Sequence, residues 1–421
     1  MRKTLGTMLL AGLSGILVAA CAGPDSTGEA EGEDTAGDKA DQIDSFDDPG
    51  SLIGNARTTL RDNITAADIG KDFGVAADNV PYPDTYWPFV DEGIDFDWTG
   101  DGQGSPLTKY MSIFDTARLD AAKKWEKKNH GSEVPDVQSW FGHCPGWTAA
   151  ALTNAPLKHG ILVKSDGNGG VTSCAAAGPG CVKFEIGDIN ALQAEAFVDG
   201  DSAFIGARCD TKPKDIKRDR NGRIMRDGTG CKGLNPGALL IVAGNVMKTQ
   251  KKGFAIDAQN DFNTDEIWNQ PAYGYHVYRY EPVTAKEAAN LVVSGSKTGP
   301  RVRYTWNKNA KGFVLVDFGI QWVTEHGPNL EPFSGKDSTR EHRMVAVIEL
   351  SAPESDPSAR IIGGEYIDDP SVGATRLTVP PFVWMAHGAG PDRLPLSVDG
   401  NNHNPYVKPS LVAQLVTLAQ Q

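Results

Sequence analysis

The spacing of apolar residues predicts helices in the first half of the chain. Between Lys109 and Lys128, apolar side chains recur at steps of three and four residues, which is the period of an amphipathic helix. A second helix is predicted from Cys144 to Leu152, where small and apolar residues follow Pro145. The first half therefore contributes helices, one of which begins at a cysteine.

From about residue 238 onward the pattern becomes that of strands. Short apolar or alternating runs, bounded by Gly, Asn and Asp, predict strands. These runs are Ala238–Val246, Gly253–Asp257, Ala272–Tyr280, a hairpin of Arg301–Trp306 with Phe313–Trp322, Met344–Leu350 and Arg360–Tyr366. A helix that carries a cysteine and packs on an antiparallel sheet is an α+β arrangement. We expect one core over residues 51–282 and a β-rich C-terminal part, 283–421, integral to the same domain.

The N-terminus has the pattern of an export signal. Arg2 and Lys3 precede an apolar stretch that ends in Leu-Val-Ala-Ala-Cys21, so residues 1–20 are predicted to be a signal peptide. The small residues before Cys21 resemble the lipobox of bacterial lipoproteins, in which the cysteine thiol is acylated. We expect secretion across the inner membrane and lipid anchoring through Cys21 at the outer membrane or cell surface. A plain secretory signal with an incidental cysteine is the alternative.

The net charge of the chain argues against only one class of binding partner. Residues 21–50 carry ten Asp or Glu and one Lys, and are predicted to be a disordered acidic tether that holds much of the net charge of −13. This acidic balance argues against a nucleic-acid partner, which would require a basic face. The segment Asp95–Gly104 has the acidic spacing of a calcium loop but lacks its full length and terminal Glu, so a solvated turn is preferred. No cofactor is expected, and no paired CxxC motif predicts a metal site.

The cysteines form two predicted pairs. Six cysteines are present, and assigning Cys21 to the anchor leaves five, so one thiol is expected to stay unpaired in an oxidising compartment. A short Gly-Pro turn separates one candidate pair, and a polar excursion separates the other. The predicted disulfides are Cys174–Cys181 and Cys209–Cys231. Cys144 is the cysteine left over.

Cys144 stands in the sequence Gln138-Ser-Trp-Phe-Gly-His-Cys-Pro-Gly-Trp147. Pro145 favours the first helical position, which places Cys144 at the N-cap with its sulfur at the positive end of the helix. That position favours the thiolate, the reactive form of cysteine. Gln138 lies six residues before Cys144, the same gap that separates the oxyanion-hole glutamine from the nucleophile in papain-like enzymes. We therefore predict a nucleophile, with a buried structural cysteine as the alternative.

The run Trp140–Trp147 resembles the signature of the transglutaminase elicitor family. The similarity extends from about Tyr86 to the C-terminus. It includes Ser105–Tyr110, Asn129–Gly131, Cys231–Gly237, Ile267–Pro271, Gly363–Tyr366 and Pro381–Trp384. The resemblance implies a papain-related fold and acyl transfer from a glutamine carboxamide to an amine through a cysteine thioester.

The resemblance also implies a histidine and an Asp or Asn after the cysteine. Asp257, at the end of a predicted strand, suits the orienting role. The family histidine would fall near Leu239 and Leu240, where this chain has none, so His276 is the candidate base at another position. His143 is adjacent to the cysteine, but helix-start geometry would direct it away from the sulfur. The residues expected to line a cleft are Trp147, Trp268, Asn269 and Gln270.

The sequence thus predicts a cell-envelope acyltransferase similar to protein-glutamine gamma-glutamyltransferases, with protein or peptide substrates. Cys144 would be the nucleophile, and Gln138 or backbone amides would stabilise the oxyanion. A papain-like peptidase or amidase is the alternative among enzymes. The alternative from another class is an envelope binding protein that has lost the catalytic histidine.

Overall fold

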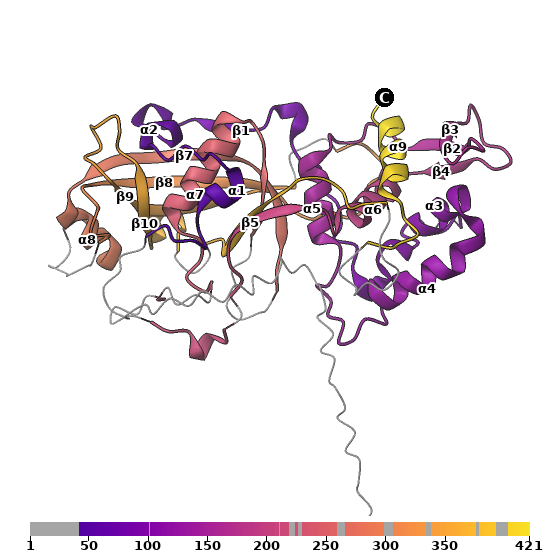
Figure 1. Cartoon of the computed structure of the whole chain (residues 1–421), viewed down its shortest axis with the longest axis horizontal. Coiled ribbons are helices and arrows are strands. Elements are labelled where there is room, and N and C mark those ends of the chain that lie inside the picture. Colours follow the sequence, from indigo (N-terminus) through magenta and orange to yellow (C-terminus); the bar gives the residue numbers. More distant parts are fainter. Residues whose placement is uncertain are drawn as a thin grey trace, which may run out of the picture.

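A computed structural model describes residues 42–421, apart from residues 101, 210, 219–223, 226–229, 259–265, 299–305, 334–337, 376–378 and 393–402. Within this part, an antiparallel sheet forms one half of the molecule and helices form most of the other (Figure 1). The α+β class expected from the sequence is confirmed.

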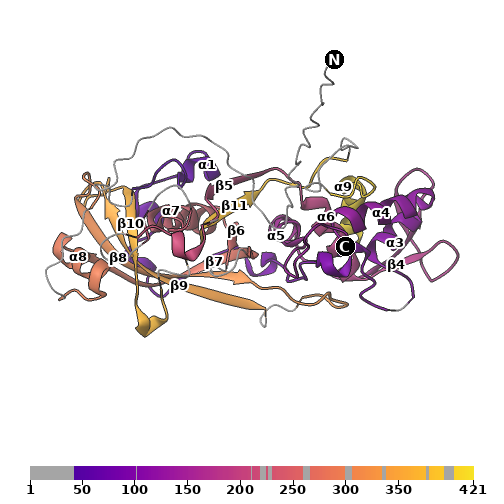
Figure 2. The same cartoon turned by 90° about the horizontal axis from the view of Figure 1, so that it is seen from below.

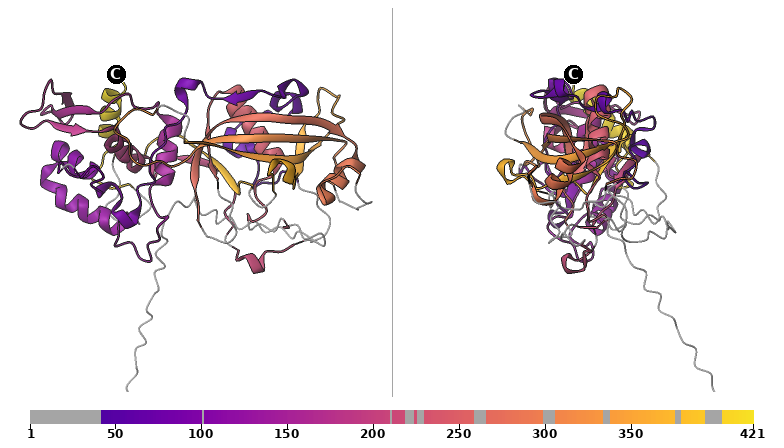
Figure 3. Two further views of the ribbon diagram at one scale, coloured as in Figure 1. Left: turned by 180° about the vertical axis from the view of Figure 1, so that it is seen from behind. Right: turned by 90° about the vertical axis from the view of Figure 1, so that its left-hand side faces the viewer.

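The large sheet has eight strands. Their order is β10–β9–β8–β7–β6–β11–β5, and β1 also pairs with β7. The long strands β7 and β8, in orange tones, span the sheet half when it is seen from behind (Figure 3). The strands are β1 (Asp72–Gly74), β5 (Ser202–Gly206), β6 (Phe254–Asp257), β7 (Asn269–Val283), β8 (Gly312–Val323), β9 (Thr339–Leu350), β10 (Ile361–Ile367) and β11 (Phe382–Ala386).

Apolar cores lie on both faces of this sheet. Along β8, Val314 and Val316 pack in one core with α7 (Pro236–Ala243), whereas Phe313 and Leu315 pack in another with α8 (Ala285–Ser294). Since neighbouring residues of a strand point to opposite faces, a strand covered on both faces reads as a continuous apolar run. The short helices α1 (Pro49–Ile53) and α2 (Leu60–Asn63) contact α7, and a π-helix, Gly244–Thr249, continues it.

The other half is a helical cluster with its own core and a small sheet of order β3–β2–β4 (Figure 1). A fully buried ion pair crosses it: Lys109 Nζ lies 2.7 Å from Asp188 Oδ2. The elements are α3 (Pro106–Phe114), α4 (Leu119–Asn129), α6 (Ile186–Phe197), α9 (Pro409–Ala419), β2 (Ile161–Ser165), β3 (Val171–Ser173) and β4 (Val182–Phe184).

Helix α5 (Cys144–Thr153) joins the two halves. It contacts α6 on one side and β6, β7 and β11 on the other, and lies between the halves in Figures 1 and 2. Gly146 permits this close packing, because a Cβ at that position would lie 1.8 Å from the carbonyl oxygen of Ala194 in α6. The small residues after Cys144 therefore set how the helix sits in the fold.

Most of the elements predicted in the second half are confirmed. The strands predicted at 253–257, 272–280, 313–322, 344–350 and 360–366 are β6, β7, β8, β9 and β10. The strand predicted at Ala238–Val246 is wrong, because this segment is the end of α7 and the start of the π-helix. All eight residues of α7 are buried, and a helix buried on every side cannot be told from a buried strand by periodicity. Residues 301–305 of the predicted hairpin lie outside the described residues.

Two predictions in the first half need correction. The helix expected over Lys109–Lys128 is divided into α3 and α4 at Asp115, which caps the end of α3. The predicted tether is too long at its end, because residues 42–50 belong to the fold. Asp47 is 1% exposed and accepts a hydrogen bond from the Asn235 N–H, and Ile43 packs against the core of the sheet half. Within the described residues, no helix is long and apolar enough to cross a membrane.

Candidate active site

Cys144 is the first residue of α5, at the junction of the two halves. His143 is the N-cap, and its N–H donates to the Tyr86 carbonyl at 2.6 Å, which fixes the entry to the helix. Pro145 follows at a position where a missing N–H costs no helical hydrogen bond. The Cys144 side chain is 1% exposed. The helix start predicted from the sequence is confirmed, with the N-cap one residue earlier than expected.

Asn269, the first residue of β7, faces the sulfur. Its Nδ2 lies 3.8 Å from Cys144 Sγ, and the carbonyl oxygen of Ile267 lies 4.0 Å from the same atom. Trp384 Nε1 donates to Asn269 Oδ1 at 2.7 Å, and this bond turns the NH₂ group of the amide toward the sulfur. The Thr148 hydroxyl of α5 donates to the Asn269 carbonyl at 2.8 Å. The helix and the strand therefore hold the amide beside the cysteine.

Asp257 lies directly opposite Asn269 in the β6–β7 ladder. Its carboxylate is buried, and Oδ1 accepts a hydrogen bond from the Trp268 N–H at 3.1 Å. Opposed residues of antiparallel strands have Cα atoms roughly 4.5–5.5 Å apart, so Asp257 lies in the neighbourhood of the cysteine. This contact orients the chain that carries Asn269.

The sulfur of Cys144 is in a disulfide, which corrects the prediction of an unpaired thiol. The two predicted pairs, Cys174–Cys181 and Cys209–Cys231, are confirmed as disulfides, so the other half of the Cys144 bond lies outside the described residues. In the disulfide form Cys144 cannot act as a nucleophile, since the thiolate is the reactive species.

His276 does not lie at the cysteine, and its predicted role as base is wrong. It is seven residues along β7 from Asn269, which corresponds to about 23 Å at the rise of a β-strand. Its Nδ1 lies 2.9 Å from Asp72 Oδ1 of β1. The sequence pattern does not show which end of a strand lies near the cysteine. It therefore could not place His276 relative to Cys144.

The other predicted residues divide between the site and the core. Gln138 is exposed, and its Oε1 accepts a hydrogen bond from Trp140 Nε1 at 2.9 Å, so its amide group is engaged by its own loop. Trp147 is 0% exposed, and its Nε1 donates to the Tyr82 carbonyl, so it is a core residue and the expectation that it lines a cleft is wrong. Trp268 is half-buried and packs edge-on against Tyr86 beside the cysteine.

Gln270 is buried, and it lies next to the half-buried carboxyl group of Glu325. Its Nε2 donates to Glu325 Oε1 at 2.5 Å. Burial raises the pKa of Glu325, although this hydrogen bond partly lowers it. Gln270 therefore supports the start of β7.

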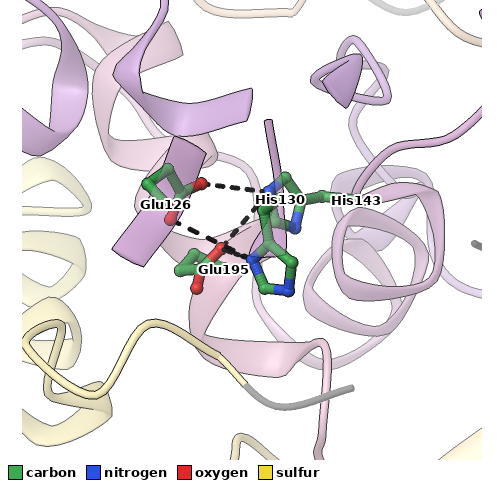
Figure 4. A group of neighbouring side chains, drawn as sticks. All are labelled: Glu126, His130, His143 and Glu195. Atoms are coloured by element: carbon green, nitrogen blue, oxygen red, sulfur yellow. Dashed lines mark hydrogen bonds and ion pairs between the residues drawn. The ribbon is translucent and has the colours of Figure 1, made fainter. Parts of the chain in front are cut away.

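Four buried side chains next to Cys144 form a cluster that the sequence did not predict. Glu126 and His130 come from the end of α4, His143 from the start of α5, and Glu195 from α6 (Figure 4). One nitrogen or oxygen of each residue lies within 4.8 Å of the others. A usable signal was the i, i+4 spacing of Glu126 and His130, which puts both on one face of a helix. The contributions of His143 and Glu195 arise only from tertiary packing.

Burial dominates the electrostatics of this cluster. Burial, and then the charge of Glu195, hold the pKa of Glu126 well above its usual range. Burial alone would raise the pKa of Glu195, but the nearby His130 and His143 lower it below its usual value. Burial lowers the pKa of His143, so its imidazole is neutral near pH 7. A metal ion would bind these groups as neutral imidazoles and ionised carboxylates.

Fold and site define an α+β protein built around a buried cysteine at a helix N-terminus, packed against an antiparallel sheet. A family model, transglutaminase elicitor, matches residues 118–395, more than half of the 421 residues. The chain belongs to the transglutaminase elicitor family. The match includes Cys144, Asp257 and Asn269, as well as all four members of the buried cluster.

The fold is similar to that of a solved transglutaminase. The crystal structure of the GP42 transglutaminase from Phytophthora sojae superposes with a TM-score of 0.61 at 19% sequence identity, covering 91% of this chain and 99% of that one. At this identity the likeness shows a shared fold. No curated protein matches the chain.

Proposed function

We propose that the chain is a transglutaminase-type acyltransferase that transfers the acyl group of a glutamine carboxamide to a primary amine through Cys144. The observation that carries the proposal is the position of Cys144 at the start of α5, with the amide of Asn269 held against its sulfur. Membership of the transglutaminase elicitor family supports the same reaction class.

The reaction uses groups that this site supplies. The Cys144 sulfur attacks the glutamine carboxamide carbon, a C–S bond forms, and the C–N bond breaks as ammonia leaves with a proton. A primary amine then attacks the thioester, forming an amide and returning the electron pair to sulfur. The partial positive charge of the helix N-terminus and the Asn269 NH₂ group both favour negative charge on the sulfur. We assign Asn269 a positioning role: its NH₂ group holds the Cys144 sulfur in place. A histidine at the family's position would otherwise take part in this.

The acceptor amine is expected to arrive as a cation, and the surroundings of Trp268 suit it. Burial raises the pKa of Tyr86, which packs on Trp268, and the negative charges of Asp91, Glu325 and Glu266 raise it further. Three carboxylates near one aromatic pair favour a positively charged side chain over an anionic one. We propose a lysine side chain of a protein or peptide as the acceptor.

The disulfide-bonded form is proposed to be latent. Acyl transfer requires Cys144 as a thiol, so a dithiol reductant must first cleave its disulfide, with two electrons passing to the two sulfurs and the reductant becoming a cyclic disulfide. A cysteine that is 1% exposed is also protected from irreversible oxidation in that state.

The test is incorporation of a labelled primary amine into a glutamine-containing protein, with and without a dithiol reductant. We expect incorporation only after reduction, and none with Cys144→Ala. Asn269→Asp keeps an acceptor for Trp384 but removes the donor facing the sulfur, so kcat should fall about 10–100-fold. His276→Gln is the matched control and should leave activity unchanged. Activity in the Cys144→Ala variant would exclude the proposal.

Two rival functions share this scaffold. A peptidase or amidase would differ only in passing the acyl group to water, so release of ammonia without amine incorporation would identify it.

A non-catalytic binding protein is suggested by Leu239 and Leu240, which stand where the family histidine was expected. Both leucines lie in α7, within the core of the sheet half rather than in the cluster around Cys144, so they do not occupy the space next to the sulfur. This position therefore does not argue against catalysis.

The cell envelope is the proposed location. Two disulfides among the described residues suit an oxidising compartment. The lipobox-like sequence before Cys21 supports a lipid anchor. An acylated thiol cannot also form a disulfide, so we propose the anchor only for chains in which the Cys21 thiol is not oxidised. Metabolic labelling with a palmitate analogue, lost in Cys21→Ala, would test it.

A further inference from the structure

The four-residue cluster of Glu126, His130, His143 and Glu195 has no role in the proposed acyl transfer. We propose that it binds one divalent transition-metal ion, with Zn²⁺ as the best-suited ion, and that this ion fixes the start of α5. The argument rests on the distances between the side chains, their burial and their charge.

Three of the four distances between imidazole nitrogens and carboxylate oxygens match the edges of a small coordination polyhedron, and the fourth is longer. His143 Nε2 lies 3.3 Å from Glu195 Oε2 and 3.5 Å from Glu126 Oε1. His130 Nδ1 lies 3.3 Å from Glu195 Oε2 and 4.0 Å from Glu126 Oε2. Ligands about 2.0–2.1 Å from a tetrahedral zinc ion lie roughly 3.3–3.5 Å from one another. Figure 4 shows the two carboxylates and two imidazoles pointing toward one another.

His143 points to a missing ligand. It is 0% exposed, and neither of its ring nitrogens makes a hydrogen bond with the described residues. Its Nε2 is nevertheless directed at two carboxylate oxygens. A buried ring nitrogen that makes no hydrogen bond is costly, and a metal ion at the centre of the cluster would satisfy it.

The charge of the cluster also calls for a cation. Glu126 and Glu195 are each 0% exposed, and among the described residues neither carboxylate pairs with a lysine or arginine. A divalent ion would balance the charge of both carboxylates when they act as its ligands. Nitrogen ligands favour Zn²⁺ and its transition-metal neighbours over Ca²⁺ and Mg²⁺, which prefer oxygen.

Outer hydrogen bonds hold the carboxylates in place, as is usual around metal ions. Asn404 donates from its side chain to Glu126 Oε2 at 2.9 Å and from its backbone N–H to Glu195 Oε1. The Ile94 N–H donates to Glu126 Oε1 at 3.3 Å. Phe89 stacks on the His130 ring and packs edge-on against His143, which keeps the site dry.

The ion would tie three helices together beside the cysteine. Its ligands come from α4, α5 and α6, and His143 immediately precedes Cys144. The proposed ion is structural: it holds the N-cap of α5, and it is not a participant in acyl transfer.

The test is elemental analysis of the purified full chain, followed by X-ray absorption at the metal edge. We expect about one zinc or other first-row ion per chain, with two imidazole ligands, oxygen ligands and no sulfur. Removing the ion with a chelator should lower Tm by several degrees, and Zn²⁺ or Co²⁺, but not Ca²⁺, should restore it.

Glu195→Gln and His130→Gln should each lower the metal content at least tenfold. The matched controls are Glu365→Gln and His403→Gln, two buried residues of the same types outside the cluster. Wild-type protein with no stoichiometric ion, and with no Tm response to Zn²⁺, Co²⁺ or Mn²⁺, would overturn the proposal. A bound ion with sulfur ligands, or one retained by both cluster variants, would also overturn it. The wild-type measurements decide the matter even if the variants do not fold.

Discussion

At the residue scale, several buried polar groups near α5 are held in environments that change their chemistry. Asp84 is fully buried, and its Oδ2 accepts a hydrogen bond from Trp87 Nε1 at 3.1 Å. Its Oδ1 has no hydrogen-bond partner among the described residues. Burial raises the pKa of Asp84 to about 8, although the hydrogen bonds from Trp87 and Thr85 partly oppose this. Asp84 therefore carries a proton in the folded protein at neutral pH.

This proton makes stability depend on pH. Since the folded pKa of Asp84 lies above the unfolded value, the folded state holds a proton that the unfolded state releases between about pH 4 and pH 8. The stabilisation is fully present below the unfolded pKa and is lost as pH rises toward 8. Asp84→Asn has no such proton, so raising the pH from 5 to 8 should increase its free energy of unfolding relative to that of the wild type by roughly 3–4 kcal/mol.

Urea unfolding at the two pH values measures this gain. Asp78→Asn is the matched control, since Asp78 is exposed, and it should shift stability equally at both pH values. Equal pH dependence in wild type and Asp84→Asn would show that Asp84 is ionised in the fold.

At the element scale, the position of Cys144 depends on how closely α5 approaches α6. A Cβ at Gly146 would meet the Ala194 carbonyl oxygen at 1.8 Å and the Val198 nitrogen at 3.2 Å, and neither backbone atom can move independently. Helix propensity alone would make Ala better than Gly at this position by about 1 kcal/mol. The close packing against α6 predicts instead that Ala at this position is less stable than Gly.

Gly146→Ala should therefore destabilise the protein by roughly 1–3 kcal/mol through overpacking. It should also displace Cys144, two residues away, and reduce amine incorporation. Gly178→Ala is the control, because nothing lies within 4 Å of a Cβ there, and it should change stability by less than about 0.5 kcal/mol. Thermal unfolding compares the two variants, and a stabilised Gly146→Ala would contradict the packing described here.

The sequence predicts elements where periodicity and burial agree. Strands β7 to β10 follow alternating or apolar runs of strand length, and the start of α5 follows from Pro145. Helix α7 was misread because it is apolar on every side, so its period carries no information. The buried cluster could not be predicted from the sequence, because only Glu126 and His130 share a helix. His143 and Glu195 lie on other helices and join the cluster only through tertiary packing.

At the scale of the whole molecule, a sheet half and a helical half meet at one helix (Figure 1). The helical half supplies Cys144 and the buried cluster behind it, and the sheet half supplies Asn269 and Asp257 in front. The site is therefore complete only when both halves are docked. Any change that separates them should reduce activity before it unfolds either core.

We propose that Cys144 is an acyl-accepting nucleophile masked by a disulfide. The most direct measurement is the site of modification by an electrophilic glutamine analogue, read by intact mass and peptide mapping before and after mild reduction. We expect no modification of Cys144 in the oxidised protein, and one adduct per chain on Cys144 after reduction. Modification of other cysteines while reduced Cys144 stays unreactive would show that Cys144 is not the nucleophile.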